Sequence, residues 1–462
     1  MTRSSPFSDA SDSSSSHGAR PSVAVAIDRR LIRSRGGSVR YLTTTITAPR
    51  PAPREAATPL PLNLALVIDA SGSMSGAPIE AAKSAVLKAI DRLSDLDHLS
   101  VVSFAEDVVL HVENMAMTAE GKVRAKLAVH ELQPRGSTNL GAGWLLGCEA
   151  AAKRRASVLA VERDHVVVLS DGHANAGIVD PVELARLAAD LRERGITTST
   201  VGIGCRYSPV QLQVLAESGG GRMHDAERPD EIAEIVLAEL LDAESTTMQN
   251  VELHLHLPPR VRAEVFGTAR ASFANGTYRV VIGAITAGVS RRVVVKLRFE
   301  GGSEGETVAL SGVLSWLDPA TAMVQELEWS CGEVQFADGA SCANQQRDPV
   351  VAELVLDQWQ AHIVQEAMAR NQAGDLDAAH RYVHEQLVYF ASYCDGIPRG
   401  PQLLLTLRAF ARSMQARYEP ARAKEMMLGS YKMGRGEEDR RRDKRFGFST
   451  YMEDQLPPDS LA

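Results

Sequence analysis

Apolar positions change their spacing several times along the chain, and each change predicts a different kind of structure. Early and late segments show the alternation typical of half-buried strands. A central segment has continuous apolar runs separated by stretches with apolar residues at helical spacing, and residues 348–428 have helical spacing alone. The pattern therefore predicts a β-rich region, a mixed α/β region and a helical region.

The central residues 62–243 predict a doubly wound α/β domain with a mostly parallel sheet. Runs that are apolar throughout are typical of strands buried on both faces, as in a parallel sheet covered by helices. The predicted strands are Leu62–Ile68, Leu99–Ala105, Val166–Leu169 and Thr197–Ile203. The predicted helices are Ile79–Leu93, Gly121–Leu132, Leu140–Arg154, Pro181–Arg194, Pro209–Glu217 and Pro229–Leu241.

Alternating runs on both sides of this region predict an antiparallel β-sandwich. Ser22–Asp28 and Val39–Ala48 lie in residues 21–50, before the α/β region, and further runs lie in residues 248–340. An isolated pair of strands is marginally stable, so we expect the early pair to join the later strands and the α/β domain to be inserted in the sandwich. The later runs are Val251–Leu257, Tyr278–Ile285, Arg291–Phe299, Thr307–Trp316 and Gln325–Glu328.

The remaining segments predict a helical region and three connecting or terminal segments. Residues 1–20 are rich in serine and predict a disordered segment, and residues 51–61 are rich in proline and predict a linker. Residues 348–428 predict a helical region, and residues 429–462 predict a charged, flexible tail. The expected helices of the helical region are Val350–Asn371, Leu376–Tyr393, Pro401–Gln415 and Glu419–Leu428.

The composition places the chain among ordinary globular proteins. Of its 462 residues, 44% are hydrophobic and 23% are charged, which argues against a mainly disordered or membrane-embedded chain. The net charge of −8 and the lack of a long basic block make nucleic acid a poor partner. No stretch has the apolar length of a secretory signal or a membrane span. Five cysteines without a C-x-x-C pair indicate reduced thiols, so we expect a cytoplasmic protein.

Oxygen-bearing side chains follow the ends of predicted strands or precede predicted helices. Asp69, Ser71 and Ser73 follow the first strand of the α/β region, Thr138 precedes a helix, and Asp171 follows another strand. Because ligands of an open α/β sheet bind at the carboxyl ends of its strands, these residues can meet at one point. Two carboxylates and three hydroxyls suit a hard cation, and we expect Mg²⁺, with Mn²⁺ or Ca²⁺ as alternatives. A remaining coordination position would accept a carboxylate from a partner protein.

The same residues resemble a known metal site. The Asp69-x-Ser71-x-Ser73 loop, Thr138 in Gly-Ser-Thr-Asn-Leu and Asp171 in Leu-Ser-Asp-Gly resemble the metal-ion-dependent adhesion site of the von Willebrand factor A-domain family. The resemblance implies direct ligation by the two serines and Thr138, with the two aspartates acting mainly through water. Integrin-type domains have further acidic residues where this chain has Ser75 and Gly76, so the resemblance implies a single metal.

The flanking segments are also similar to bacterial intracellular proteins in which an A-domain is inserted in a β-sandwich and followed by helices. This likeness implies a role in assembly or regulation, beside a MoxR-type AAA+ ATPase or another assembly component. We expect a non-enzymatic protein that uses the metal to bind an acidic side chain of a partner. The loops Met74–Pro78, Arg135–Leu140 and Gly172–Gly177 would set specificity, and Arg135 would add a charged contact.

Two other functions stay open at the level of sequence. His173, two residues after Asp171, is placed to act as a base in a metal-dependent hydrolase, although the G-x-S-x-G, phosphate-loop and H-E-x-x-H motifs are absent. Alternatively, the sandwich and helices bind a partner as a metal-independent scaffold. The segment Phe446–Asp454, with aromatic residues followed by two carboxylates, is a candidate occupant of a metal site or a partner surface.

Overall fold

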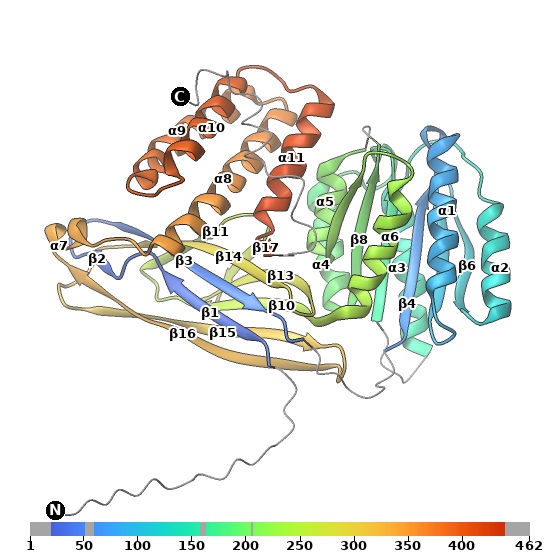
Figure 1. Ribbon diagram of the computed structural model, residues 1–462, viewed down its shortest axis with the longest axis horizontal. Coiled ribbons are helices and arrows are strands. Elements are labelled where there is room, and N and C mark those ends of the chain that lie inside the picture. The colour runs from blue at the N-terminus through green and yellow to red at the C-terminus, as the bar shows by residue number, and fades with distance from the viewer. Residues whose placement is uncertain (1–19, 51–59, 158–162, 205–206, 439–462) are drawn as a thin grey trace, which may run out of the picture.

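The computed structural model describes residues 20–50, 60–157, 163–204 and 207–438 (Figure 1). It contains a mostly parallel α/β sheet, two antiparallel sheets and a C-terminal helical region, so the predicted fold class is confirmed. The predicted disordered segment 1–20, except Arg20, and most of the predicted linker lie outside the described residues. The segment Phe446–Asp454 lies outside them as well.

The α/β domain has a six-stranded sheet in the order β6-β5-β4-β7-β8-β9, in which the β5–β6 pair alone is antiparallel. The antiparallel edge strand and the glycine-containing strand at the other edge were not predicted, because neither has a continuous apolar run. The strands are β4 (Leu62–Asp69), β5 (His98–Phe104), β6 (Val108–Ala116), β7 (Arg163–Ser170), β8 (Ile196–Ile203) and β9 (Gly220–Ala226). The helices are α1 (Ala77–Arg92), α2 (Ala119–His130), α3 (Leu140–Ser157), α4 (Pro181–Glu193), α5 (Pro209–Ser218) and α6 (Glu231–Ser245), with a short 3₁₀ turn at Gly72–Met74.

Strand β4 shows why continuous apolar runs indicate a sheet covered on both faces. All eight of its residues are buried. Leu64 and Leu66 point to the core formed with α1, α2 and α6, whereas Ala65 and Val67 point to the core formed with α3, α4 and α5. Since side chains alternate along a strand, both faces need apolar residues.

The β-sandwich consists of two antiparallel-paired sheets that contain strands from both sides of the α/β domain. Strand β3 pairs with β14 from Ser38↔Phe299 to Thr47↔Ser290, so the early strands join the later ones as predicted. The turn at Asn275-Gly276 has positive φ at both residues and links a hairpin. One sheet contains β1 (Ser22–Ile27), β3 (Ser38–Thr47), β14 (Ser290–Phe299), β11 (Val261–Val265) and β17 (Glu437–Glu438). The other contains β12 (Arg270–Ala274), β13 (Thr277–Thr286), β10 (Thr246–His256), β15 (Thr307–Asp318), β16 (Met323–Ala337) and the parallel-paired β2 (Leu31–Arg33).

The helical region continues further than its sequence pattern predicts. The last predicted helix ends at Leu428, but α11 continues to Gly434, and β17 then pairs with β14. The expectation of a free tail from residue 429 is therefore wrong for residues 429–438, because Tyr431 is buried in the core of the α/β domain. The helices are α7 (Gly339–Asn344), α8 (Pro349–Gln372), α9 (Leu376–Cys394), α10 (Gly400–Ser413) and α11 (Pro420–Gly434).

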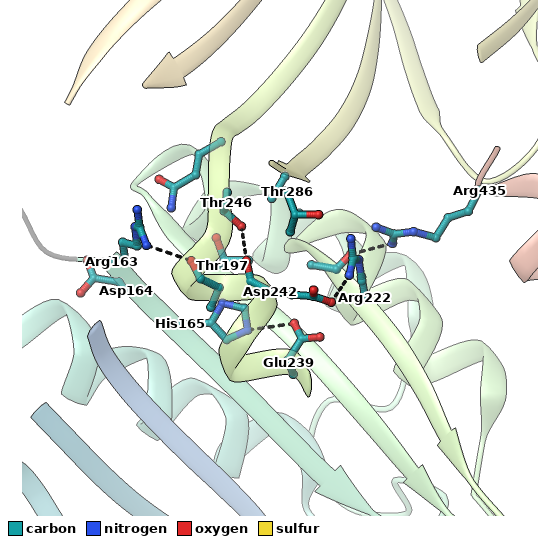
Figure 2. A pocket seen from close by; sticks show the side chains of 15 residues that line it. Arg163, Asp164, His165, Thr197, Arg222, Glu239, Asp242, Thr246, Thr286 and Arg435 are labelled. Carbon is teal, nitrogen blue, oxygen red and sulfur yellow. Dashed lines mark hydrogen bonds and ion pairs between the residues drawn. The ribbon is translucent and has the colours of Figure 1, made fainter. Parts of the chain in front are cut away.

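The amino-terminal edge of the parallel sheet faces the sandwich. Helix α6 runs directly into β10, and Gly220 of β9 lies so close to β13 that a Cβ atom on Gly283 would be 2.9 Å from the Gly220 carbonyl oxygen. A cleft of about 440 Å³, its opening to solvent included, lies at this junction (Figure 2). Its lining includes Arg163 of the sheet, Thr286 of the sandwich and Arg435. The carboxyl edge of the sheet consequently points away from the sandwich.

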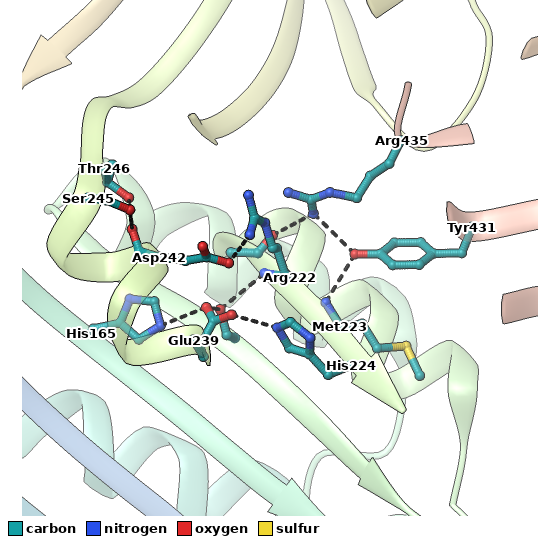
Figure 3. Close-up of polar contacts among 12 residues, drawn as sticks. His165, Arg222, Met223, His224, Glu239, Asp242, Ser245, Thr246, Tyr431 and Arg435 are labelled. Carbon is teal, nitrogen blue, oxygen red and sulfur yellow. Dashed lines mark hydrogen bonds and ion pairs between the residues drawn. The ribbon is translucent and has the colours of Figure 1, made fainter. Parts of the chain in front are cut away.

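Helix α11 covers the exposed edge of the sheet at β9 (Figure 3). The Met223 N–H donates a hydrogen bond to the Tyr431 hydroxyl at 3.0 Å, and Arg435 donates to the Gly221 carbonyl at 2.9 Å. The buried Lys424 ammonium lies 2.7 Å from an Asp225 carboxylate oxygen. Tyr431 and Arg435 satisfy backbone groups that an edge strand would otherwise leave unpaired, and all three side chains join the helical region to the α/β domain.

Replacing Tyr431 with phenylalanine removes the acceptor of the buried Met223 N–H. We expect Tyr431→Phe to lower the free energy of unfolding by about 2 kcal/mol. In the folded variant the Met223 N–H would be buried without a hydrogen-bond acceptor, whereas in the unfolded chain water hydrates it. Chemical denaturation measures the loss, and faster hydrogen exchange at the Met223 amide locates it. Tyr389→Phe, at a tyrosine of α9 that is 65% exposed, is the matched control. Equal stability of the two variants would contradict the proposed role of Tyr431.

Candidate functional site

The five oxygen-bearing residues identified in the sequence come together at the carboxyl edge of the sheet. Asp69 is the last residue of β4, and Asp171 follows directly after β7, whose Leu169 is paired with Ile68. Ser71 and Ser73 lie in the loop and 3₁₀ turn after β4, and Thr138 lies just before α3. Four of the five are buried, and Ser73 is exposed.

Three loops carry these residues: the first, after β4, contains Ser71 and Ser73, the second, before α3, contains Thr138, and the third, after β7, contains Asp171. Hydrogen bonds that involve the backbone hold the three loops together. The Gly72 N–H donates to the Gly136 carbonyl at 3.1 Å, which joins the first loop to the second. The Thr138 N–H donates to Asn175 Oδ1 at 2.9 Å, and the Asn175 N–H donates back to the Thr138 carbonyl at 3.1 Å. These bonds join the second loop to the third. The positions of the side-chain oxygens are therefore set by a connected backbone framework.

The oxygens of the first and third loops are in direct contact. The Ser73 hydroxyl donates to Asp171 Oδ1 at 2.7 Å and lies 3.0 Å from the Ser71 hydroxyl oxygen. On the other side, Asp69 accepts hydrogen bonds from the Ser170 hydroxyl at 2.6 Å and from the Ser71 N–H at 2.8 Å. Each aspartate is thus oriented by a neighbouring serine.

Gly172 lies beside several of these oxygens and places no Cβ atom among them. A Cβ atom on this residue would lie 3.4 Å from Thr138 Oγ1, 3.7 Å from Asp69 Oδ2 and 3.8 Å from Ser73 Oγ. Oxygens from the first two loops thus lie within 4 Å of the Cβ position that Gly172 of the third loop leaves empty. Carboxylate and hydroxyl oxygens are the donors that a hard divalent cation takes, so the residues present fit such an ion.

The electrostatics of the site also favour a cation. Burial raises the pKa of Asp69 to about 6, hydrogen bonds from Ser170 and Ser71 lower it, and the nearby Asp171 carboxylate raises it. A positive charge between the two carboxylates would offset both the burial and their mutual repulsion. Among the described residues, no three His, Cys, Asp or Glu side chains meet to hold a metal ion. A metal at this edge would therefore depend on the hydroxyls.

Two supporting residues were not assigned by sequence reasoning, and one assigned residue has another contact. The role of Ser170 was overlooked although it directly precedes Asp171, and Asn175 carries no motif that marks it. Arg135 donates to Asp107 Oδ1 at 2.8 Å and to the Ser103 hydroxyl at 3.1 Å, so its guanidinium braces the second loop. His173 is exposed on the third loop.

The cleft at the opposite edge is a less suitable binding site because its charged side chains already have partners within the chain, either charged groups or backbone carbonyls. Arg222 forms an ion pair with Asp242, and Arg163 donates to the Ala243 carbonyl at the end of α6. Glu239, which is 3% exposed, contacts His165 and His224 on two different strands (Figure 3). These groups hold α6 to the sheet, and we interpret the cleft as a structural junction.

Comparison with known proteins agrees with the geometry. Residues 63–238, which contain all five oxygen-bearing residues, match the sequence profile of the von Willebrand factor type A domain. The chain contains a von Willebrand factor type A domain. No helix among the described residues has the length and apolar character needed to cross a membrane.

Three similar proteins define how far this VWA likeness extends. The uncharacterized protein sll0103 of Synechocystis is 33% identical over 45% of this chain and 47% of its own length, and YfbK of Escherichia coli is 26% identical over 43% and 34%. The aligned part is thus about half or less of these relatives. The solved von Willebrand factor type A structure from Catenulispora acidiphila shares 20% identity with a TM-score of 0.66 and covers 90% of this chain and 98% of its own. The arrangement of the sandwich, VWA domain and helices therefore has a counterpart in a known fold.

The buried Glu239 predicts a specific pH dependence of VWA stability. Burial alone raises the pKa of Glu239, but His224 and His165 lower it by more, so its pKa lies well below the usual value. A carboxylate with a lowered pKa contributes stability above its unfolded pKa of about 4.5 and loses it as the pH falls through the folded pKa. We expect Glu239→Gln to cost about 3 kcal/mol at pH 7 and progressively less in more acidic buffer.

Urea denaturation of the wild type and Glu239→Gln, from pH 7 to below the unfolded glutamate pKa of about 4.5, measures the difference in their free energies of unfolding. Glu234→Gln, at an exposed glutamate of the same helix, is the matched control and should show no such trend. A gap between wild type and Glu239→Gln that stays constant with pH would disprove the assignment.

Proposed function

We propose that the chain is a non-enzymatic binding protein whose VWA domain holds one Mg²⁺ and uses it to bind an acidic side chain of a partner protein. The observation that supports this proposal is the convergence of Asp69, Ser73 and Thr138 oxygens, from the loops after β4 and before α3, beside Gly172 of the loop after β7. The site lies at the edge of the domain that faces away from the sandwich. A partner can therefore approach it without displacing the sandwich.

Each residue has a distinct part in the proposed site. Ser71, Ser73 and Thr138 would ligate the ion through their hydroxyls, and Asp69 and Asp171 would act mainly through water. Because three of the ligands are neutral, a bound ion would keep much of its charge and offer a position to a carboxylate. The loops that carry Asn175 and Arg135 are held by hydrogen bonds, so they would present a preformed rim to the partner.

The partner and the cellular setting are parts of the same proposal. A protein with an exposed Asp or Glu, such as a component of an assembly that includes a MoxR-type AAA+ ATPase, would suit the site. A cytoplasmic location is supported by Cys148, Cys331, Cys342 and Cys394, which are free, buried thiols. The domain limits proposed from the sequence, with the VWA domain at residues 62–243, complete this interpretation.

Mg²⁺ is expected to stabilise the chain through Thr138. The thermal midpoint of the wild type should rise with Mg²⁺ concentration, because a ligand that binds the folded state alone shifts the unfolding equilibrium. Thr138→Ala should remove this rise, whereas the neighbouring Ser137→Ala should keep it. Calorimetric titration with MgCl₂ and differential scanning calorimetry measure both effects. An unchanged Mg²⁺ response in Thr138→Ala would place the ion elsewhere.

Capture of partners from the native cell lysate tests the binding function. Wild type and Thr138→Ala, both shown to be folded, are compared in Mg²⁺ and in EDTA. A partner retained by the wild type in Mg²⁺ alone would support the proposal, and saturation of the bait with free acetate should compete with it. Partners retained equally in all four conditions would overturn it in favour of a metal-independent scaffold. Metal-dependent turnover of an ester or phosphate substrate that disappears in His173→Ala would instead indicate a hydrolase.

A further inference from the structure

Helix α9 carries two histidines whose rings meet on its accessible side. His380 and His384 are four residues apart, which places them one above the other on the same face of the helix. Their Nε2 atoms are 3.0 Å apart, and their ring centroids are 4.2 Å apart. His384 is exposed and His380 is half-buried, so both nitrogens can be reached from solvent.

The 3.0 Å distance between the Nε2 atoms of His380 and His384 matches the spacing of two adjacent ligand atoms on one metal ion. A transition metal binds imidazole nitrogen at about 2.0–2.1 Å, so two nitrogens at angles between octahedral and tetrahedral values lie about 2.8–3.4 Å apart. We propose that His380 and His384 form a chelating site for a borderline divalent transition metal such as Ni²⁺, Cu²⁺ or Zn²⁺. The helix backbone fixes the two Cα atoms, so the second nitrogen binds at no further cost in chain entropy.

The two proposed sites have different ligand atoms and therefore should prefer different metals. Imidazole nitrogen favours Cu²⁺, Ni²⁺ and Zn²⁺, whereas the carboxylate and hydroxyl oxygens of the VWA site favour Mg²⁺. No third His, Cys, Asp or Glu among the described residues completes a group around a metal ion. The remaining positions would hold water and stay open to an added ligand, as in metal sites that bind exchangeable groups.

Other histidines of the chain show what distinguishes this pair. His254 Nε2 lies 3.2 Å from Glu252 Oε2, and Glu252 in turn accepts hydrogen bonds from Arg279, so that imidazole belongs to an ion-pair cluster. His165 and His224 both contact Glu239. On α9, by contrast, the two imidazoles contact each other. Helix α9 is also separated from the VWA sheet by α11 (Figure 1), so the inference does not rest on the proposed function.

Calorimetric titration of the full, untagged chain with NiCl₂ in excess MgCl₂ tests the site. The wild type should bind Ni²⁺, and His380→Ala and His384→Ala should each weaken the tightest binding by about tenfold or more, because either change destroys the chelate. The double variant should bind Ni²⁺ only slightly more weakly than either single variant. The effects of two residues that act as one unit on the binding free energy are not additive. Alanine favours helices, so α9 is expected to remain folded, and circular dichroism checks this.

His256→Ala, at an exposed histidine of β10, and Thr138→Ala are the controls, and neither should alter Ni²⁺ affinity. Cu²⁺ should bind more tightly than Ni²⁺ at the same site, in the order typical of nitrogen ligands. Absence of Ni²⁺ binding by the wild type, equal affinity in the wild type and the α9 variants, or loss of binding in His256→Ala would each overturn the proposal.

Discussion

Strand β4 pairs in parallel with β5 on one side and β7 on the other, and this arrangement determines where the loops of the VWA site emerge. Parallel pairing brings the carboxyl ends of β4 and β7 to the same edge, so Asp69 and Asp171 become neighbours although they are far apart in sequence. Ser170 then donates to Asp69, and Ser73 donates to Asp171. If the strand pairing slipped by one residue, side chains of β4 would exchange faces, and the aspartates would be misplaced.

The burial of two carboxylates at this edge has a cost that the hydroxyls offset in part. Hydrogen bonds from Ser170 and Ser71 lower the pKa of Asp69, while burial and the Asp171 charge raise it. The geometry therefore keeps negative charge in a place where the apolar core would otherwise exclude it. These are the groups that we propose hold a cation.

The two edges of the VWA sheet have different tasks. At the amino-terminal edge, matched ion pairs and histidine contacts hold α6 to the sheet, and α6 continues without a loop into the sandwich. Helix α11 covers β9 and satisfies the Met223 N–H through Tyr431. The carboxyl edge carries the loops and faces away. The sandwich thus supports the domain from its amino-terminal edge, and α11 supports it at β9.

The sequence alone determined the fold class and the strands with continuous apolar runs, because both follow from the periodicity of local burial. It also predicted the insertion of the α/β domain in the sandwich, because an isolated early pair of strands would be marginally stable. It also identified Asp69, Ser71, Ser73, Thr138 and Asp171 as candidates, since they follow strands or precede a helix. Only the tertiary structure decided what depends on distant contacts. Strands β6 and β9 form because a neighbouring strand offers them hydrogen bonds. Helix α11 extends to Gly434 because the Tyr431 hydroxyl is buried against the α/β domain and accepts a hydrogen bond from the Met223 N–H. The hydrogen bonds of Asn175 to Thr138 and of Arg135 to Asp107 were also not predicted. Hydrogen bonds between loops depend on which residues are neighbours in space, and a single sequence does not reveal this.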